Sequence, residues 1–338
     1  MGVDVEESSL GRRALLIAAV AAGAALLSAC APVEPTTSGP SGPPQSEHPS
    51  PSGHDRTPAP SHASTATAEP RRASAAPAEP ATPTPASTPT ATPTPTSTEN
   101  AQPDRAAVAA RFAGAVPTQW GTDVAGVRST LLAPTGPSGA PRVALTFDAC
   151  GGGGGSGFDA ELIAGLRAAA IPATLFLNSR WIQANPQLAA DLAADPLFVL
   201  GNHGTAHVPL SVAGRGAYGI PGTRSPQEAV DEVWGNHEVL TGLTGAPPRF
   251  FRAGTAHYDE IAAQIVHDLG ETPIGFSVNG DGGATFGPGT VRQEFGRAQA
   301  GGIVLAHMNH PEGGTSPGAL DAVADLLARG FEFVHVDG

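Results

Sequence analysis

Short apolar segments alternate with amphipathic segments from Arg142 onward. The apolar segments are continuous in character, as in Val-Ala-Leu-Thr-Phe and Ile-Val-Leu-Ala. This is typical of strands that are buried on both faces of a parallel sheet. The predicted strands are 142–149, 173–179, 197–203, 250–254, 272–278, 301–308 and 331–336.

Helical patterns occupy the segments between these strands. Phe158, Leu162, Ile163 and Leu166 recur at the period of an amphipathic helix. A capping residue before proline predicts further helix starts at Asn185-Pro186, Ser225-Pro226 and Ser316-Pro317. Strands that alternate with helices predict an α/β fold, either a (β/α) barrel or a doubly wound parallel sheet. In both folds, functional side chains gather at the carboxyl ends of the strands.

The amino terminus has the pattern of a bacterial lipoprotein signal. Arg12 and Arg13 precede an uncharged apolar run of 14 residues, and Leu-Ser-Ala-Cys follows, ending at Cys30. The run is too short to span a membrane comfortably. We therefore expect residues 1–30 to be an export signal whose cleavage leaves a lipid on Cys30. This predicts an extracytoplasmic protein that is lipid-anchored to the bacterial cell membrane.

Composition changes sharply after the signal. Residues 31–103 hold 18 of the 34 prolines and contain no Phe, Trp, Tyr, Leu, Ile or Met. Such a segment cannot bury enough apolar surface to fold, so it predicts a disordered tether. Residues 104–141 follow as a lead-in segment with a helix expected at 104–115, and 142–338 form the predicted catalytic domain. The formal net charge of −13 excludes nucleic acid as a partner, because phosphate binding needs clustered basic residues.

Polar side chains stand at the ends of several predicted strands. They are Asp148, His203, His207, Arg252, Asp281 and His307. Two imidazoles four residues apart can bind one divalent ion, and zinc fits them best. Such an ion acidifies water and polarises a carbonyl, a carboxylate can take the proton of that water, and a further histidine can protonate a leaving nitrogen. The set predicts hydrolysis of an amide or an ester.

The order Thr-Phe-Asp, His-x-x-x-His, Arg after Phe-Phe, and Leu-x-His resembles the polysaccharide deacetylases, the NodB-homology group of carbohydrate esterases. The resemblance spans about 142–336, and the sequence Leu-Gly-Asn-His-Gly-Thr-Ala-His-Val-Pro-Leu at 200–210 is its most specific part. It implies a distorted (β/α) barrel with about seven parallel strands. It also implies metal-dependent removal of N-acetyl, sometimes O-acetyl, groups from glycans such as peptidoglycan or chitin.

The resemblance assigns a role to each matching residue. Asp148 would be the general base braced by Arg252, His203 and His207 the metal ligands, and His307 the general acid, tuned by Asp281 or Asn279.

One departure from the family pattern concerns the metal. The family's first motif is Thr-Phe-Asp-Asp, whose second Asp is the third protein ligand, and this chain has Ala149 there. A water, Asp148 itself or Cys150 could take that place. The leading hypothesis is therefore a metal-dependent deacetylase, and the alternative is a glycan-binding lipoprotein without catalysis on the same fold.

Overall fold

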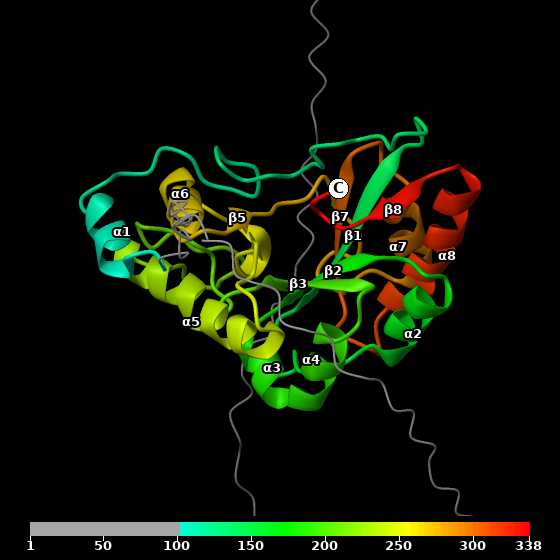
Figure 1. The fold of residues 1–338 in the computed structure, drawn as a ribbon, viewed down its shortest axis with the longest axis horizontal. Coiled ribbons are helices and arrows are strands. Elements are labelled where there is room, and N and C mark those ends of the chain that lie inside the picture. Colours follow the sequence, from blue (N-terminus) through cyan, green and yellow to red (C-terminus); the bar gives the residue numbers. More distant parts are fainter. Residues whose placement is uncertain (1–101) are drawn as a thin grey trace, which may run out of the picture. The chain divides into compact units, whose positions relative to one another are not determined.

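The computed structural model describes residues 102–338, which form one curved parallel sheet with helices around it (Figure 1). The sheet has the strand order β5-β4-β3-β2-β1-β7-β6, and β8 pairs with the amino end of β1. The strands are β1 (Arg142–Ala149), β2 (Ala173–Leu177), β3 (Phe198–Asn202), β4 (Phe250–Phe251), β5 (Thr272–Pro273), β6 (Val278–Asn279), β7 (Gly302–His307) and β8 (Glu332–Val334). This is the α/β architecture of a distorted (β/α) barrel.

The fifth predicted strand is wrong as a single element. Thr272–Pro273 pairs with β4 at one end of the strand order, whereas Val278–Asn279 pairs with β7 at the other. The residues between them cross from one edge of the sheet to the other, and Ile274 among them is fully buried. A buried crossing segment has the same apolar pattern as a strand, so seven predicted strands become eight.

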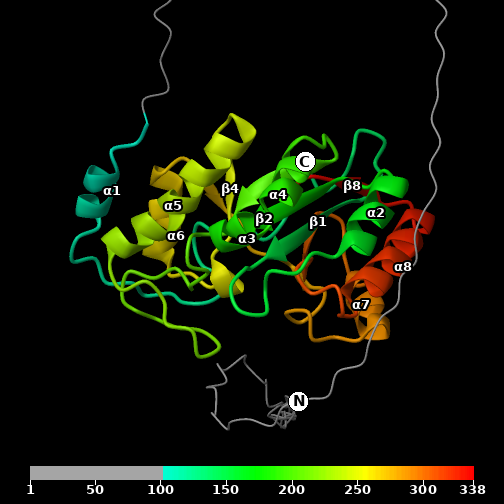
Figure 2. The same cartoon turned by 90° about the horizontal axis from the view of Figure 1, so that it is seen from below.

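Helices cover the outside of the sheet. They are α1 (Arg105–Arg111), α2 (Ala160–Ala168), α3 (Ser179–Ala184), α4 (Pro186–Ala193), α5 (Pro226–Thr244), α6 (Glu260–Asp268), α7 (Pro288–Phe295) and α8 (Thr315–Ala328), with a 3₁₀ turn η1 (Gly254–Ala256). Helices α5 and α6 lie beside the edge that β4 and β5 form, and α2, α7 and α8 lie at the opposite side (Figure 2).

Local sequence determines where most of these helices begin. Ser225 accepts a hydrogen bond from the Glu228 amide and starts α5 as predicted. Asn185 precedes Pro186 at the start of α4, although its side chain does not cap that helix. The helix predicted at Ser316-Pro317 is present as α8, but it begins at Thr315, and Gly314 rather than Ser316 occupies the N-cap position.

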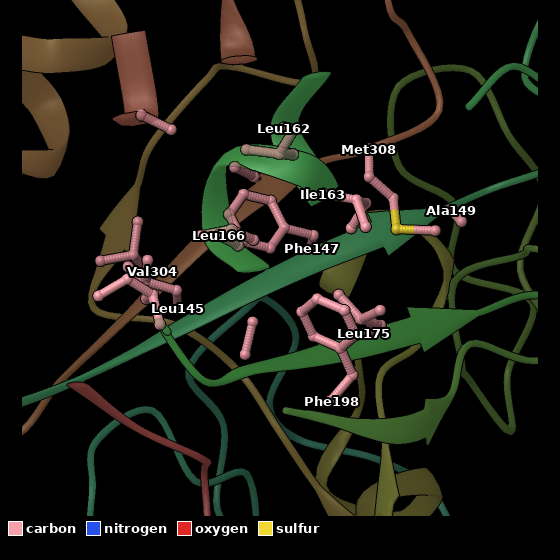
Figure 3. Packing of buried hydrophobic residues seen from close by; sticks show 14 of the residues in the cluster. Leu145, Phe147, Ala149, Leu162, Ile163, Leu166, Leu175, Phe198, Val304 and Met308 are labelled. Atoms are coloured by element: carbon pink, nitrogen blue, oxygen red, sulfur yellow. The ribbon is translucent and has the colours of Figure 1, made fainter. Parts of the chain in front are cut away.

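The two faces of β1 carry different side chains. Leu145, Phe147 and Ala149 are fully buried in an apolar cluster with α2 and its neighbours, as Figure 3 shows. Ala144, on the opposite face, belongs to a second apolar cluster inside the curved sheet. Successive side chains of a strand alternate between faces, so Thr146 and Asp148 also lie on the inner face.

The lead-in segment 104–141 packs along the sheet rather than standing apart from it. Asp104 caps α1, which packs against α5 and α6. Further along, the Arg128 amide donates to Pro273 beside β5, and the Leu131 amide donates to Gly301 before β7. The segment therefore lies across the gap between the two edges of the sheet.

The predicted signal at 1–30, the lipid-bearing Cys30 and nearly all of the predicted tether at 31–103 lie outside the described residues. Within residues 102–338, no helix combines the length and the apolar character that crossing a membrane requires.

Candidate functional site

Asp148 and Arg252 form a buried ion pair at the carboxyl ends of β1 and β4. Nη1 of Arg252 lies 2.7 Å from Oδ1 of Asp148 and 2.8 Å from Oγ1 of Thr146. Nη2 donates to the carbonyl oxygen of Gly275 at 2.9 Å. The guanidinium carbon lies 4.2 Å from the centre of the Phe176 ring. These contacts satisfy a charge that is fully buried, and they fix the direction of the carboxylate.

A glycine in the neighbouring strand makes room for this arrangement. Gly201 of β3 pairs in register with Phe176 of β2. A Cβ atom at Gly201 would lie 2.6 Å from the Phe176 ring. Glycine is therefore needed for the ring to lie under the Arg252 guanidinium.

His203 directly follows β3, and its orientation is set by backbone contacts. Its Nδ1 lies 2.8 Å from the carbonyl oxygen of Arg252, which can only accept, so Nδ1 carries a hydrogen. Nε2 lies 3.6 Å from Oδ2 of Asp148 and 3.9 Å from Sγ of Cys150. Burial lowers the pKa of His203, but the charge of Asp148 and the contact with Cys150 outweigh it, and the pKa rises above its ordinary value.

A buried polar network lies beneath His203. Asn202 accepts hydrogen bonds from the Asn236 side chain at 2.9 Å and donates to Glu271 at 3.0 Å. Glu271 in turn lies 2.8 Å from Nδ1 of His237. Burial raises the pKa of Glu271 to about 7 against the hydrogen bonds of His237 and Asn202. These contacts connect α5 to the end of β3, so they hold the residue that precedes His203 in place.

His207 lies in a loop with unusual backbone geometry. Its φ is +59°, and its ring centre lies 4.8 Å from that of His203. A Cβ atom at Gly254 would lie 2.3 Å from the carbonyl carbon of His207, so only glycine allows this approach. Glu232 of α5 accepts hydrogen bonds from the amides of Ala206 at 2.8 Å and His207 at 3.0 Å. Burial raises the pKa of Glu232 to about 7 against these hydrogen bonds.

His307 and Asp281 form the opposite side of the site. His307 at the end of β7 is the register partner of Asp148, so the two side chains are neighbours on paired strands. Asp281 is fully buried, lies 3.0 Å from Nδ1 of His307 and accepts hydrogen bonds from its amide and from Thr315. Asn279 is exposed and accepts from a turn amide, so Asp281 rather than Asn279 is the partner of His307.

The opposite charges of His307 and Asp281 shift the pKa of both groups. Burial lowers the pKa of His307, but the charge and the hydrogen bond of Asp281 outweigh it and raise that pKa well above its ordinary value. Burial raises the pKa of Asp281, but His307 outweighs it and the pKa falls below its ordinary value. The pair is therefore held as imidazolium and carboxylate near neutral pH.

The structure brings together all six predicted site residues and adds Cys150. One ligand atom each of Cys150, His203 and His207 lie within 4.8 Å of one another. Burial raises the pKa of the Cys150 thiol, but His207 and hydrogen bonds from the neighbouring histidines outweigh it and leave the pKa well below its ordinary value. Ala149, by contrast, faces the apolar cluster outside the sheet.

Residues 135–274 match the family model described as polysaccharide deacetylase. The match shows a polysaccharide deacetylase domain in this part of the chain. The match includes Asp148, His203, His207 and Arg252, and it ends before Asp281 and His307, which the structure places beside them.

Solved structures share the fold. A family 4 carbohydrate esterase from Bacillus subtilis, PdaA, is 19% identical with a TM-score of 0.50, and the match covers 63% of this chain and 83% of that one. A wild-type CE4 family pseudoenzyme from Bacillus anthracis is 21% identical with a TM-score of 0.49, and the match covers 57% of this chain and 63% of that one. The chain thus spans less than two thirds of the length of the first structures that it matches. No curated protein matches the sequence.

The donor atoms of the site fit a divalent metal ion. His203 presents Nε2 toward the site because its Nδ1 is hydrogen-bonded to the backbone. This is how proteins orient a metal-binding imidazole. Nitrogen and sulfur donors are those that zinc and cobalt prefer, whereas magnesium and calcium prefer oxygen.

Proposed function

We propose that this domain is a metal-dependent hydrolase that removes N-acetyl, or O-acetyl, groups from a polysaccharide. With N-acetyl groups as substrate, its reaction class is hydrolysis of carbon–nitrogen bonds other than peptide bonds. The observation that carries the proposal is the placement of Asp148 and His307 as register partners beside the His203 and His207 imidazoles. A base and an acid on neighbouring strands can act on the two sides of one scissile bond.

Asp148 acts as the general base. Its Oδ1 is bound to Arg252, which orients the carboxylate, and its Oδ2 faces His203 and the site. A carboxylate held in this way can accept the proton of an attacking water. Arg252 is a positioning residue, because its donors bind Asp148, Thr146 and backbone carbonyls.

His307 acts as the general acid. The Asp281 charge that raises its pKa keeps it protonated near neutral pH, which is the state that a proton donor needs. Because Nδ1 of His307 is hydrogen-bonded to Asp281, Nε2 is the atom that can donate to the leaving nitrogen. Asp281 thus positions the imidazole ring and also stabilises its protonated form.

His203 and His207 would hold the divalent ion, which we propose to be zinc. When bound, such an ion supplies Lewis-acid polarisation of the acetyl carbonyl and lowers the pKa of water.

We further propose that the substrate is an N-acetylated glycan of the cell envelope or the environment, peptidoglycan or chitin-like, and that a lipid on Cys30 anchors the protein outside the cytoplasm. The support for the anchor is the Arg12-Arg13 pair, the apolar run and Leu-Ser-Ala before Cys30. Globomycin-sensitive processing and labelling by a palmitate analogue would test it, and a Cys30→Ser chain that still carries the label would contradict it.

Acetate release from N-acetylglucosamine oligomers tests the enzymatic proposal. We expect release by the purified protein with zinc or cobalt, loss after chelation and recovery when the ion is returned. Asp148→Asn should abolish release, whereas the matched change Asp191→Asn on an exposed face of α4 should not. If metal-loaded protein binds the glycans but releases no acetate from a broad N- and O-acetylated panel, the non-catalytic alternative is correct.

A further inference from the structure

The side chain at position 149 points away from the site in this structure. Ala149 is fully buried, and its side chain packs with Phe147 and Met308 on the outer face of β1 (Figure 3). A carboxylate there would enter an apolar cluster, where an unpaired charge is strongly disfavoured. The residue that replaces the family's third ligand must therefore come from another position.

Cys150 lies on the face that the site occupies. The two-residue period of β1 carries Thr146 and Asp148 on its inner face, and Cys150 is the next residue in that series. Its Sγ lies 3.9 Å from Nε2 of His203. One ligand atom each of Cys150, His203 and His207 lie within 4.8 Å of one another, which is close enough for one ion to contact all three.

The hydrogen bonds around His203 direct its Nε2 toward two other electron-pair donors. Nδ1 of His203 donates to the Arg252 carbonyl, so the lone pair of Nε2 points at Oδ2 of Asp148 and at Sγ of Cys150. The S–H hydrogen of Cys150 is then the one hydrogen available between these three electron-pair donors. A metal ion bound to Nε2 and Sγ would take the place of that hydrogen.

The backbone of Cys150 is held in position by its surroundings. A Cβ atom at Gly151 would lie 2.5 Å from the Trp181 amide nitrogen, so the chain passes closely over α3 at this point. The Gly151 amide donates to Gly155, and Arg180 donates to the carbonyl oxygen of Cys150. These contacts fix the backbone from which the thiol projects, as a preorganised ligand requires.

We propose that Cys150 is the third protein ligand of the metal, so that the centre is His203, His207 and a thiolate. The proposal rests on the metal site of the proposed function and deepens it. On binding, the S–H bond of Cys150 breaks, a sulfur–metal bond forms and the proton passes to solvent, with no change of oxidation state. A thiolate ligand selects zinc or cobalt over magnesium, calcium and manganese.

Cobalt substitution of the full-length protein tests this ligand directly. A thiolate bound to Co²⁺ gives an intense near-ultraviolet charge-transfer absorption that imidazole and carboxylate ligands do not give. We expect this absorption in the wild type and in Cys30→Ser, which removes the other cysteine of the chain. We expect it to be absent from Cys150→Ala and Cys150→Asp. A cobalt-loaded wild type without this absorption would overturn the proposal without any variant being needed.

Zinc affinity gives a second readout. Loss of an outer partner of a metal ligand already weakens binding about 10–100-fold, so Cys150→Ala should weaken it at least as much. Cys150→Asp should recover part of the affinity, whereas Ala149→Asp added to Cys150→Ala should not, because position 149 faces the apolar cluster. Zinc content that is unchanged in Cys150→Ala would overturn the proposal, and loss of activity with that zinc retained would instead indicate a thiol nucleophile.

These spectra and affinities are independent of acetate release. A thiolate–cobalt absorption without turnover leaves the ligand assignment correct and refutes the proposed function. Full acetate release by zinc-bound Cys150→Ala would support the proposed function and refute Cys150 as a metal ligand.

Discussion

Removal of the Arg252 guanidinium should destabilise the fold through the charge that it leaves behind. Arg252→Met keeps an unbranched apolar side chain and removes the donors to Asp148, Thr146 and Gly275. Arg252 is 0% exposed and Asp148 is 3% exposed, so water cannot replace the lost donors.

The magnitude follows from that burial. Breaking a buried ion pair on one side costs about 3–5 kcal/mol, because an uncompensated charge stays in the interior. For a domain of this size, each kcal/mol lowers the melting temperature by about 2–4 °C, so a loss of about 6–20 °C is expected. The double variant Asp148→Asn/Arg252→Met removes both charges of this pair, and it should therefore be more stable than Arg252→Met alone.

Urea denaturation in the presence of chelator measures the energetic coupling between Asp148 and Arg252 without a contribution from bound metal. The free energies of unfolding of the wild type, both single variants and the double variant complete a double-mutant cycle. If Arg252→Met costs less than about 1 kcal/mol, as an exposed pair would, the reasoning from burial is wrong. It is equally wrong if the costs of the two single changes simply add.

Three further results follow from the site. In Asp281→Asn, loss of the charge that raises the pKa of His307 should move the alkaline limb of the kcat profile to lower pH, and an unmoved limb would contradict the acid role. Gly254→Ala places a Cβ 2.3 Å from the His207 backbone and should reduce zinc binding in equilibrium dialysis. The control Gly289→Ala has open space around the new Cβ and should bind zinc as the wild type does. Equal zinc binding by both variants would exclude a steric role for Gly254. Chelation should lower the melting temperature of the wild type, because the ion binds only the folded state, and an unchanged value would argue against a metal centre.

Strand positions were largely predictable from the sequence, because both faces of the central strands are buried. The exception at 272–278 has a physical reason. Ile274 is buried inside the sheet while the chain crosses between its two edges, and burial alone produces the apolar pattern that predicts a strand.

The site residues that directly follow or end a strand are predictable from the sequence, because the carboxyl ends of parallel strands meet at one edge of the sheet. Asp148, Arg252 and His307 come from three strands whose carboxyl ends meet, and the structure places them in contact or in register. By sequence position alone, Cys150 is one of three options for the missing ligand, because it lies one residue past the family's second Asp position. The two-residue period of β1, which is readable in the sequence, places residue 150 on the same face as Asp148.

No sequence pattern predicts a role for Glu232 in the site. It lies within an ordinary helical pattern, and only the folded chain shows that its carboxylate accepts the amides of the loop that carries His207. Contacts between a helix and a distant loop depend on how the helix docks, which local patterns do not encode.

The hydrogen bond from Arg252 to Gly275 also links the orientation of Asp148 to the contact between the two edges of the sheet. Gly275 lies in the segment that crosses between β5 and β6, the two ends of the strand order. The guanidinium that orients Asp148 therefore also secures the seam of an incompletely closed barrel. A fluctuation that opens the seam would release the proposed general base at the same moment, so amide hydrogen exchange at 274–278 should report when the Asp148 carboxylate loses its orientation.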